Sequence, residues 1–326
     1  MVLWSMETVR KMEIKNKIII VVIFSILVYM AFLIFGEIDK LLTAFNNFNW
    51  VYVPLILLLT SLNYILRFIK WDYYLSCLRI NISKRDSIVL FLSGLLMSIT
   101  PAKSGEVFKS YLLKRLKGTK MRKSIPIVFA ERATDIFGLV ILAAIGFSAF
   151  PYGKDVLFII MTFILVTILI TQSRDICLGL IDFIGRFHFV SKFTNKFYEL
   201  YESAYTLFSF KNLLIAVSIS VISWFFECLA LFFVLKGFGT DPSLLFSIFV
   251  FSFSTIAGVI SMIPGGLGVA EGSMTGLFLI TGIQKAVAVS ATLIIRFCTL
   301  WFGVLIGLIA LYRFRTKFTE YNNKLE

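Results

Sequence analysis

Basic and acidic side chains accompany a short Pro/Gly segment at residues 101–106, which reads Pro-Ala-Lys-Ser-Gly-Glu inside an apolar stretch. A break at membrane depth leaves a helix N-terminus whose N–H groups and positive dipole end attract anions. Lysines beside it would suit a phosphate headgroup, or would extend to a membrane interface. Both roles are open for the first lysine, and the interface is favoured for the second. The candidate residues are Pro101, Lys103, Gly105, Glu106 and Lys109.

A second Pro/Gly segment, at residues 261–272, repeats this pattern with candidates Pro264, Gly265, Gly266, Gly268 and Glu271. Each segment is followed by a glutamate, and carboxylates at membrane depth are costly and rarely idle. These glutamates would bind a cationic part of a headgroup, carry a coupling proton, or complement the dipole of the helix that they begin. Glycines at 268, 272 and 276 form a small-residue stripe, for which close helix packing is the favoured interpretation.

Charged residues also lie inside longer apolar runs. Glu131 and Arg132 each stand within one helical turn of Asp135, so ion pairs between them are possible. Glu227 and Arg296 are the lone charges of two later runs and are candidates for pairing across two helices. A structural ion pair and a contact with substrate are equally open for these residues.

The composition places these candidates in a membrane protein. Of 326 residues, 59% are hydrophobic and 16% are charged, whereas about a quarter are charged in soluble domains. This excludes a soluble globular enzyme and a disordered chain. Four dispersed cysteines and one histidine predict no disulfide set, metal site or cofactor. Because P-loop and nucleophile motifs are missing, we expect no enzymatic activity, although a lipid enzyme using Glu or Asp alone stays open.

Long uncharged runs predict an all-α polytopic membrane protein. The second run ends in a basic-aromatic segment, residues 67–71, that is typical of a membrane interface. Two pairs of shorter runs, 87–102 with 105–117 and 242–270 with 271–281, are broken by Pro and Gly and predict re-entrant helical hairpins. Six runs predict transmembrane helices: 18–36, 41–66, 124–150, 156–173, 212–235 and 286–312.

The distribution of basic residues predicts the topology. With the N-terminus in the cytoplasm, the cytoplasmic stretches hold 26 Lys and Arg residues and the outer stretches hold four. This asymmetry follows the positive-inside rule and explains the net charge of +13 without nucleic acid as a partner. We expect a multi-pass protein of the cell membrane with both termini in the cytoplasm. Residues 174–211 would be a cytoplasmic amphipathic connector.

The two broken segments indicate an internal repeat. Ser, Pro and Gly at 98, 101 and 105 recur at 261, 264 and 268, a constant offset of 163. Residues 50–150 and 212–312 would each contain a span, a hairpin and a second span within one membrane domain, residues 1–326. The single helix between them would invert the second copy. Inverted repeats with helices broken at mid-membrane are typical of transporters, and an old duplication without transport is the alternative.

Together these motifs resemble the lysylphosphatidylglycerol synthase transmembrane (flippase-like) family, the membrane half of the multiple peptide resistance factor. The resemblance covers about residues 18–312. Because only 14 residues follow the sixth expected helix, we expect the stand-alone form without the aminoacyl-transferase domain. The segments that carry the resemblance are 67–71, 101–106 with Lys109, 131–132 with Asp135, and 264–272.

The resemblance implies movement of a lipid between leaflets, which in two-part members is an aminoacylated phosphatidylglycerol. We therefore expect a flippase-like protein whose partners are membrane lipids with phosphate-containing headgroups. Two alternatives stay open: a non-catalytic assembly factor bound to a membrane lipid- or glycosyl-transferase, and an ion or small-solute transporter. The residues that the resemblance supports as the site are Lys103, Glu106, Glu131, Arg132, Glu271 and the two breaks.

Overall fold

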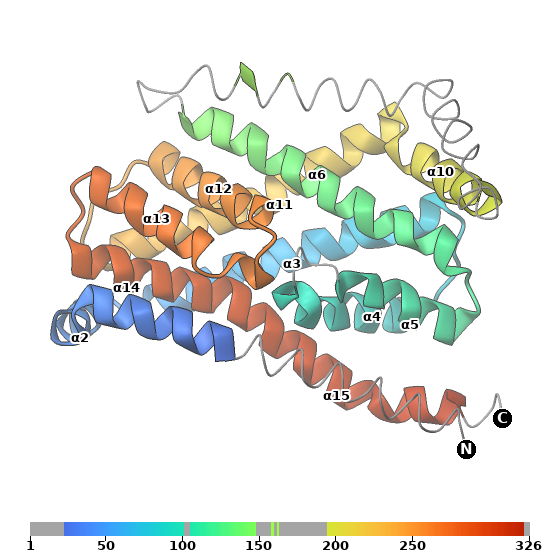
Figure 1. The fold of residues 1–326 in the computed structure, drawn as a ribbon, viewed down its shortest axis with the longest axis horizontal. Coiled ribbons are helices and arrows are strands. Elements are labelled where there is room, and N and C mark those ends of the chain that lie inside the picture. The colour runs from blue at the N-terminus through green and yellow to red at the C-terminus, as the bar shows by residue number, and fades with distance from the viewer. Residues whose placement is uncertain (1–22, 101–104, 148–157, 160–161, 163–193, 323–326) are drawn as a thin grey trace.

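The computed structural model describes residues 23–100, 105–147, 158–159, 162 and 194–322, and all regular elements among them are helical (Figure 1). A helix suits these apolar runs because it satisfies the backbone polar groups where no water is available. Among the described residues, three helices are long and apolar enough to cross a membrane: Tyr52–Cys77, Phe210–Gly237 and Lys285–Arg313. The structure therefore supports an all-α polytopic protein, while the count of six spans and the re-entrant hairpins stay predictions.

The first half of the molecule is the part up to residue 147. A short 3-10 turn, Met97–Ile99, follows α4, and residues 97–107 between α4 and α5 are called the first break. Residues 101–104 of this break lie outside the described part, and with them Pro101 and Lys103. The helices are Ile23–Gly36, α2 (Ile38–Asn47), α3 (Tyr52–Cys77), α4 (Lys84–Leu96), α5 (Phe108–Lys117) and α6 (Met121–Phe147).

The second half is the part from residue 194 onward. A 3-10 turn, Pro264–Gly266, lies between α12 and α13, and residues 261–268 are called the second break. A π-helical segment, Phe297–Trp301, joins α14 to α15. Most of the expected span 156–173, and the first half of the connector (174–193), fall outside the described residues. The helices are α10 (Thr194–Phe208), α11 (Phe210–Gly237), α12 (Leu244–Ile260), α13 (Val269–Ile280), α14 (Lys285–Arg296) and α15 (Phe302–Asn322).

The predicted second span, 41–66, is wrong in its bounds. A turn at residues 48–51 separates α2 from α3, where the Asn49 N–H donates to the Gly237 carbonyl oxygen at 2.9 Å. α3 then continues to Cys77, so the basic-aromatic segment 67–71 lies inside the helix and does not follow its end. Lys70 and Trp71 are fully buried. The helix continues past residue 66 because the charged residues that follow, Arg67 and Lys70, are neutralised by Asp135, far along the chain.

The two halves interlock. α3 and α11 pack side by side through the centre, with α6 along one side and α14–α15 along the other (Figure 1). α12 packs along α6, and α4 packs along α15, so the helix before each break rests on the last helix of the other half. Both contacts require glycine. A Cβ on Gly146 would lie 2.5 Å from the Phe249 nitrogen, and one on Gly307 would lie 2.5 Å from the Leu96 nitrogen.

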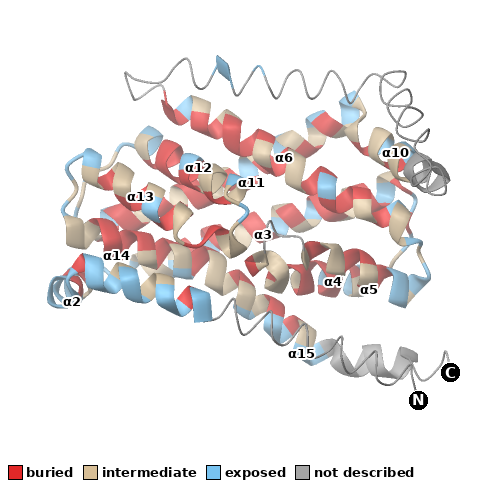
Figure 2. Cartoon of the chain, viewed as in Figure 1, coloured by how far each residue is buried: buried red, intermediate tan, exposed pale blue. Residues whose placement is uncertain are grey.

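The two breaks meet near the middle of the molecule. A Cβ on Gly265 would lie 3.8 Å from the Cα of Ile99, which brings the second break against the first. Gly265, Gly266 and Gly268 have φ of 62°, 66° and 84°, a left-handed conformation that glycine adopts without steric cost. Buried side chains form two clusters, one that includes residues of α12, α13 and α14 and one that includes residues of α4 and α5, and α3, α6 and α11 contribute to both (Figure 2).

The glycine stripe of α13 does not pack as predicted within the described part of the chain. A Cβ on Gly272 or Gly276 would meet no described atom within 4 Å. Close approaches are made instead by Gly138 and Gly258, besides the two interlocking glycines. Spacing alone therefore identified a stripe of small residues without showing which glycines face a neighbouring helix.

Candidate functional site

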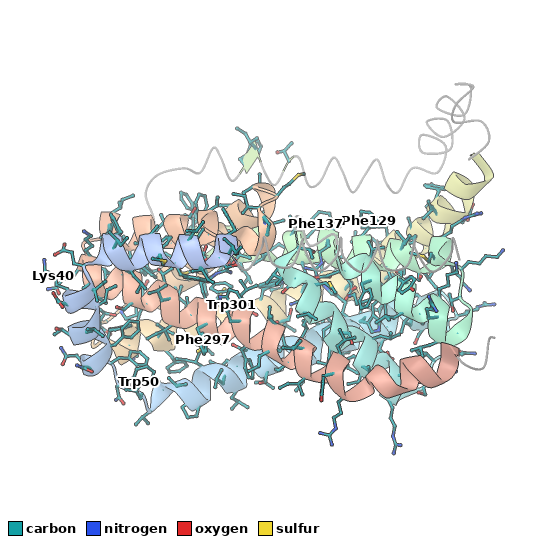
Figure 3. The ribbon with its side chains drawn as sticks, turned by 60° about the horizontal axis from the view of Figure 1, so that its bottom comes forward. Lys40, Trp50, Phe129, Phe137, Phe297 and Trp301 are labelled. Atoms are coloured by element: carbon teal, nitrogen blue, oxygen red, sulfur yellow. The ribbon has the colours of Figure 1, made fainter. Side chains whose placement is uncertain are left out.

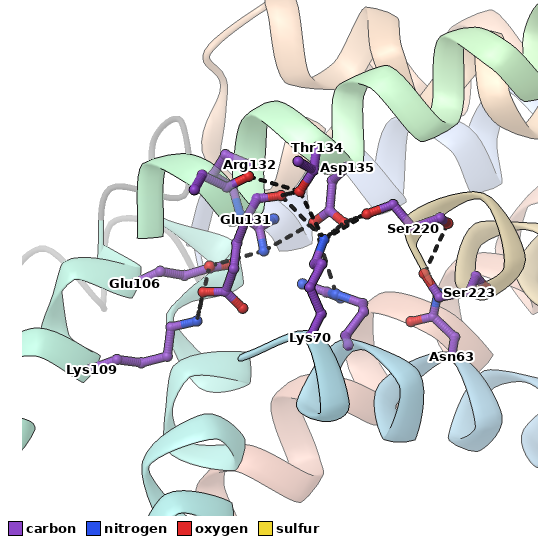
Figure 4. Close-up of polar contacts among 12 residues, drawn as sticks. Asn63, Lys70, Glu106, Lys109, Glu131, Arg132, Thr134, Asp135, Ser220 and Ser223 are labelled. Carbon is purple, nitrogen blue, oxygen red and sulfur yellow. Dashed lines mark hydrogen bonds and ion pairs between the residues drawn. The ribbon is translucent and has the colours of Figure 1, made fainter. Parts of the chain in front are cut away.

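Buried charges of the first half converge on Asp135 of α6. The Lys70 ammonium, on α3, lies 2.5 Å from Asp135 Oδ1 and donates to the Ser220 hydroxyl of α11 at 2.7 Å (Figure 4). The Thr134 hydroxyl and the Glu131 carbonyl oxygen are each 3.3 Å from the same nitrogen. Because a buried ammonium is costly without partners, this set of acceptors explains how α3 carries a lysine with no exposed surface.

Two arginines face the other carboxylate oxygen of Asp135. Arg132 Nη2 lies 3.3 Å from Asp135 Oδ2, so the contact expected from their spacing is present. The same nitrogen lies 3.0 Å from Glu106 Oε2, which ties the first break to α6. Arg67 Nε lies 4.0 Å from Asp135 Oδ2, and its guanidinium lies 5.5 Å from the centre of the Trp224 ring on α11.

Lys109 of α5 belongs to the same network, and the prediction that it extends to a membrane interface is wrong. Its ammonium lies 2.6 Å from Glu131 Oε2 and 3.8 Å from Glu106 Oε2, and its side chain is almost fully buried. The ammonium also lies 4.5 Å from the centre of the Trp71 ring. Gly94 of α4 makes this route possible, since a Cβ there would lie 2.6 Å from the Lys109 stem.

In the second half, an ion pair between Arg296 and Glu271 holds the break. Arg296 Nε lies 2.6 Å from Glu271 Oε1, and Arg296 Nη2 donates to the Gly265 carbonyl oxygen at 2.6 Å. The other oxygen of Glu271 accepts the Gly268 N–H at 2.7 Å and thereby caps the start of α13. The capping interpretation of Glu271 therefore describes one of its oxygens, while the other oxygen holds the arginine.

Two aromatic residues complete this pair. The Trp301 Nε1–H donates to the Tyr29 hydroxyl at 2.8 Å, and that hydroxyl donates to Glu271 Oε1 at 3.4 Å. Tyr29 brings the helix Ile23–Gly36 to the second break. The π-helical segment begins directly after Arg296, and such segments inside helices are frequent at functional sites.

A cavity of about 300 Å³ lies where the two halves meet. Charged groups from both halves line it, and so do residues of both breaks, including Ser98 and Gly265. Phe129 of α6 also lines the cavity and points outward from that helix (Figure 3), with 64% of its surface exposed. The cavity thus lies beside a lipid-facing surface. Its charged lining residues are Arg67, Arg132, Asp135, Glu227 and Arg296.

Comparison with known sequences identifies the family. The model of the lysylphosphatidylglycerol synthase TM region matches residues 18–307. The chain belongs to this family. Membership and the apolar helices together make it a membrane protein.

Two archaeal proteins are similar to this chain over most of their length. A UPF0104 membrane protein of Methanothermobacter thermautotrophicus is 24% identical over 311 residues, which are 87% of this chain and 91% of the relative. A UPF0104 membrane protein of Methanocaldococcus jannaschii is 25% identical over 325 residues, 92% of this chain and 96% of the relative. The similarity therefore extends over both halves and both breaks.

The structure brings most of the site residues predicted from the sequence into two clusters. Glu106, Lys109, Glu131, Arg132 and Asp135 form the first, with Gly105 at its edge, where its N–H donates to the Thr100 hydroxyl at 2.8 Å. Glu271 and Arg296 form the second around Gly265 and Gly268, with Pro264 and Gly266 in the same break. Glu227 is buried on α11 and lines the cavity together with Arg296.

The site list drawn from the sequence missed several contributors, among them Arg67, Lys70, Tyr29 and Trp301. Arg67 and Lys70 stand three residues apart, which places both on one face of α3. That spacing beyond an apolar run was a usable signal. Tyr29 gave none, because a single tyrosine in an apolar helix is common.

Proposed function

We propose that this protein moves a lipid with a phosphate-bearing headgroup between the two leaflets of the cell membrane. The headgroup would pass through the cavity while the hydrocarbon chains stay in the bilayer. The observation that carries the proposal is the presence of Arg67, Arg132 and Arg296, contributed by both halves, around one cavity at the junction of two broken helices. Arginine binds phosphate through paired N–H donors and is the favoured side chain for such contacts.

An anionic substrate would bind this network by replacing one of its carboxylates. Five cations and five carboxylates balance one another, so an added phosphate must compete with the carboxylates for the arginines. Arg132 is suited to this exchange, because its Nε makes no hydrogen bond with any described residue. The ten groups are Arg67, Lys70, Lys109, Arg132, Arg296, Glu106, Glu131, Asp135, Glu227 and Glu271.

The proposed movement follows from what the arginines hold. Arg132 connects the first break to α6, and Arg296 clamps the carbonyl oxygen of Gly265 in the second break. A phosphate that takes over one arginine loosens the break that this arginine holds. Broken helices that meet at mid-membrane are the elements that rearrange in transporters with inverted repeats. No covalent bond forms or breaks in this scheme, and the termini stay in the cytoplasm.

Leaflet exchange in liposomes tests the proposal. Purified protein would be reconstituted with head-labelled anionic, zwitterionic or prenyl-phosphate lipids, and labelled lipid reaching the opposite leaflet would be counted. We expect exchange of phosphate lipids with net negative charge, and its loss in Arg132→Gln and in the double variant Glu106→Gln, Glu271→Gln. The matched control is Lys114→Gln with Lys117→Gln, two exposed positions on α5.

Three results would contradict the proposal. Equal exchange by Arg132→Gln and by the control would remove the arginines from the pathway. Exchange of none of the lipids by folded wild-type protein, together with a membrane enzyme that copurifies and depends on this chain for activity, would favour an assembly factor. Transport of an ion or small solute without lipid exchange would favour the other alternative.

A further inference from the structure

A second hollow lies on the outside of the molecule, between α4 and α15, and shares no lining residue with the cavity. Its volume is about 380 Å³. Two arginines line it, Arg85 near the start of α4 and Arg313 on α15, and its other lining residues are all aliphatic. These include Ile88, Leu92, Ile306 and Ile309. We call this surface the α4–α15 groove.

The aliphatic part of the groove belongs to the hydrocarbon region of a bilayer. Its α15 side is part of Lys285–Arg313, one of the helices long and apolar enough to span a membrane. Ile88 and Ile309 expose 41% and 55% of their surfaces. Because Arg313 ends that span and Arg85 lies in the first turn of α4, both arginines stand at one end of the groove, which is where a spanning helix would reach the lipid headgroups.

The arginines at this end have no protein partner in the described part of the chain. Their neighbours are paired elsewhere: Lys84 forms an ion pair with Asp72, and Asp86 accepts from the Ser83 hydroxyl at 2.7 Å. No hydrogen bond or ion pair joins Arg85 or Arg313 to a described residue. Two unpaired guanidinium groups above an aliphatic slot are complementary to one molecule with an anionic head and a hydrocarbon tail.

We propose that the α4–α15 groove is a binding site for an anionic phospholipid of the cytoplasmic leaflet, separate from the transport cavity. Its phosphate would bind Arg85 and Arg313, and one acyl chain would lie along Ile88, Leu92 and Ile309. From Arg85 to Leu92 the groove extends about 10 Å along α4, enough for part of an acyl chain. The lipid would lie across the contact between α4 and α15, and so would hold the two halves together.

Native mass spectrometry of the delipidated full chain tests this site. Phosphatidylglycerol and phosphatidylcholine would be titrated separately, and the affinity of the first bound lipid compared. For Arg85→Gln with Arg313→Gln we expect the affinity for phosphatidylglycerol to fall about 5-fold for each arginine, or about 25-fold together. Phosphatidylcholine has the same phosphate but no net charge, so we expect it to bind more weakly and to lose less affinity in this variant. The control is Lys114→Gln with Lys117→Gln, which removes the same charge from the exposed end of α5.

A second variant, Ile309→Trp, fills the groove and keeps both arginines. We expect it to weaken the same first binding step, with the wild-type melting temperature in lipid-free detergent. The proposal is overturned if phosphatidylglycerol binds the double arginine variant as it binds the control, or if both lipids bind equally. Full competition by inorganic phosphate would indicate a phosphate site without a lipid chain. A shift from dimer to monomer in Ile309→Trp, with lipid affinity retained, would assign the groove to a second copy of the chain.

Discussion

The two breaks are held in different ways. The first is held by a network of side chains from α3, α5 and α6, in which Glu106 has contacts with both Arg132 and Lys109. The second is held by Arg296, which donates hydrogen bonds both to the Gly265 carbonyl oxygen and to the Glu271 carboxylate. We call this arrangement the clamp. A distributed network tolerates the loss of one member, while a single clamp does not. The second break should therefore be the more sensitive of the two to substitution.

The largest effect is expected from Arg296→Gln. This change leaves Glu271 buried without its cation and frees the Gly265 carbonyl oxygen, and removing one partner of a buried pair costs about 3–5 kcal/mol. Equilibrium unfolding in mixed micelles would measure it. The double variant Arg296→Gln, Glu271→Gln should recover part of the loss, because no unpaired charge stays buried. A loss below about 1 kcal/mol, the range of an exposed pair, would show that the clamp does not hold the break.

A smaller loss is expected from Lys70→Met in the first half. Asp135 keeps Arg132 at 3.3 Å and Arg67 at 4.0 Å, so its charge stays compensated. We expect a loss of about 1–3 kcal/mol, comparable to one unsatisfied buried group. The same unfolding measurement applies. If Lys70→Met cost as much as Arg296→Gln, the contrast between a network and a clamp would be wrong.

The two glycine contacts between the halves, at Gly146 and Gly307, should lose similar amounts of stability when glycine is replaced by alanine. This would show that the halves differ in how their breaks are held and not in how they pack on each other. Gly146→Ala and Gly307→Ala each place a methyl group 2.5 Å from a backbone nitrogen, and overpacking of this kind costs about 1–3 kcal/mol. Gly276→Ala is the control, since its Cβ meets no described atom and alanine should gain up to about 1 kcal/mol in a helix. Thermal unfolding of the three variants would measure this. Very unequal losses for the first two would mean that the halves are not interlocked symmetrically.

The smallest effect concerns Glu37, which joins the end of the helix Ile23–Gly36 to α14. Hydrogen bonds from Lys40 and Lys285 lower the pKa of this exposed carboxyl below its ordinary value of 4.5. A depressed folded-state pKa contributes stability above 4.5, and the contribution disappears as the pH falls through the lower value. Glu37→Gln should therefore lower the melting temperature slightly at neutral pH and not at all in acid. A difference that persists in acid would contradict this role.

The sequence predicted what depends on local pattern. The runs 124–150 and 212–235 correspond closely to α6 and α11, and the second Pro/Gly break lies where it was expected, between α12 and α13. Prediction from the sequence failed where a charged side chain is neutralised by a residue far along the chain. Arg67 and Lys70 follow the end of an apolar run in the sequence, yet the carboxylate partner of Lys70 lies 65 residues further along the chain. Lys109 looked like a surface lysine for the same reason, since Glu131 and Trp71 come from other helices.

The interlocking of the halves also affects how the chain is made. Leu96 of α4 docks beside Gly307, which the ribosome adds 211 residues later. At about 5–20 residues per second, α4 waits roughly 10–40 s for its partner during synthesis. Throughout that interval the charged groups of the first half have neighbours within their own half, but the face of α4 that α15 will cover has none. The newly made first half therefore depends on surrounding lipid or on the insertion machinery to cover that face.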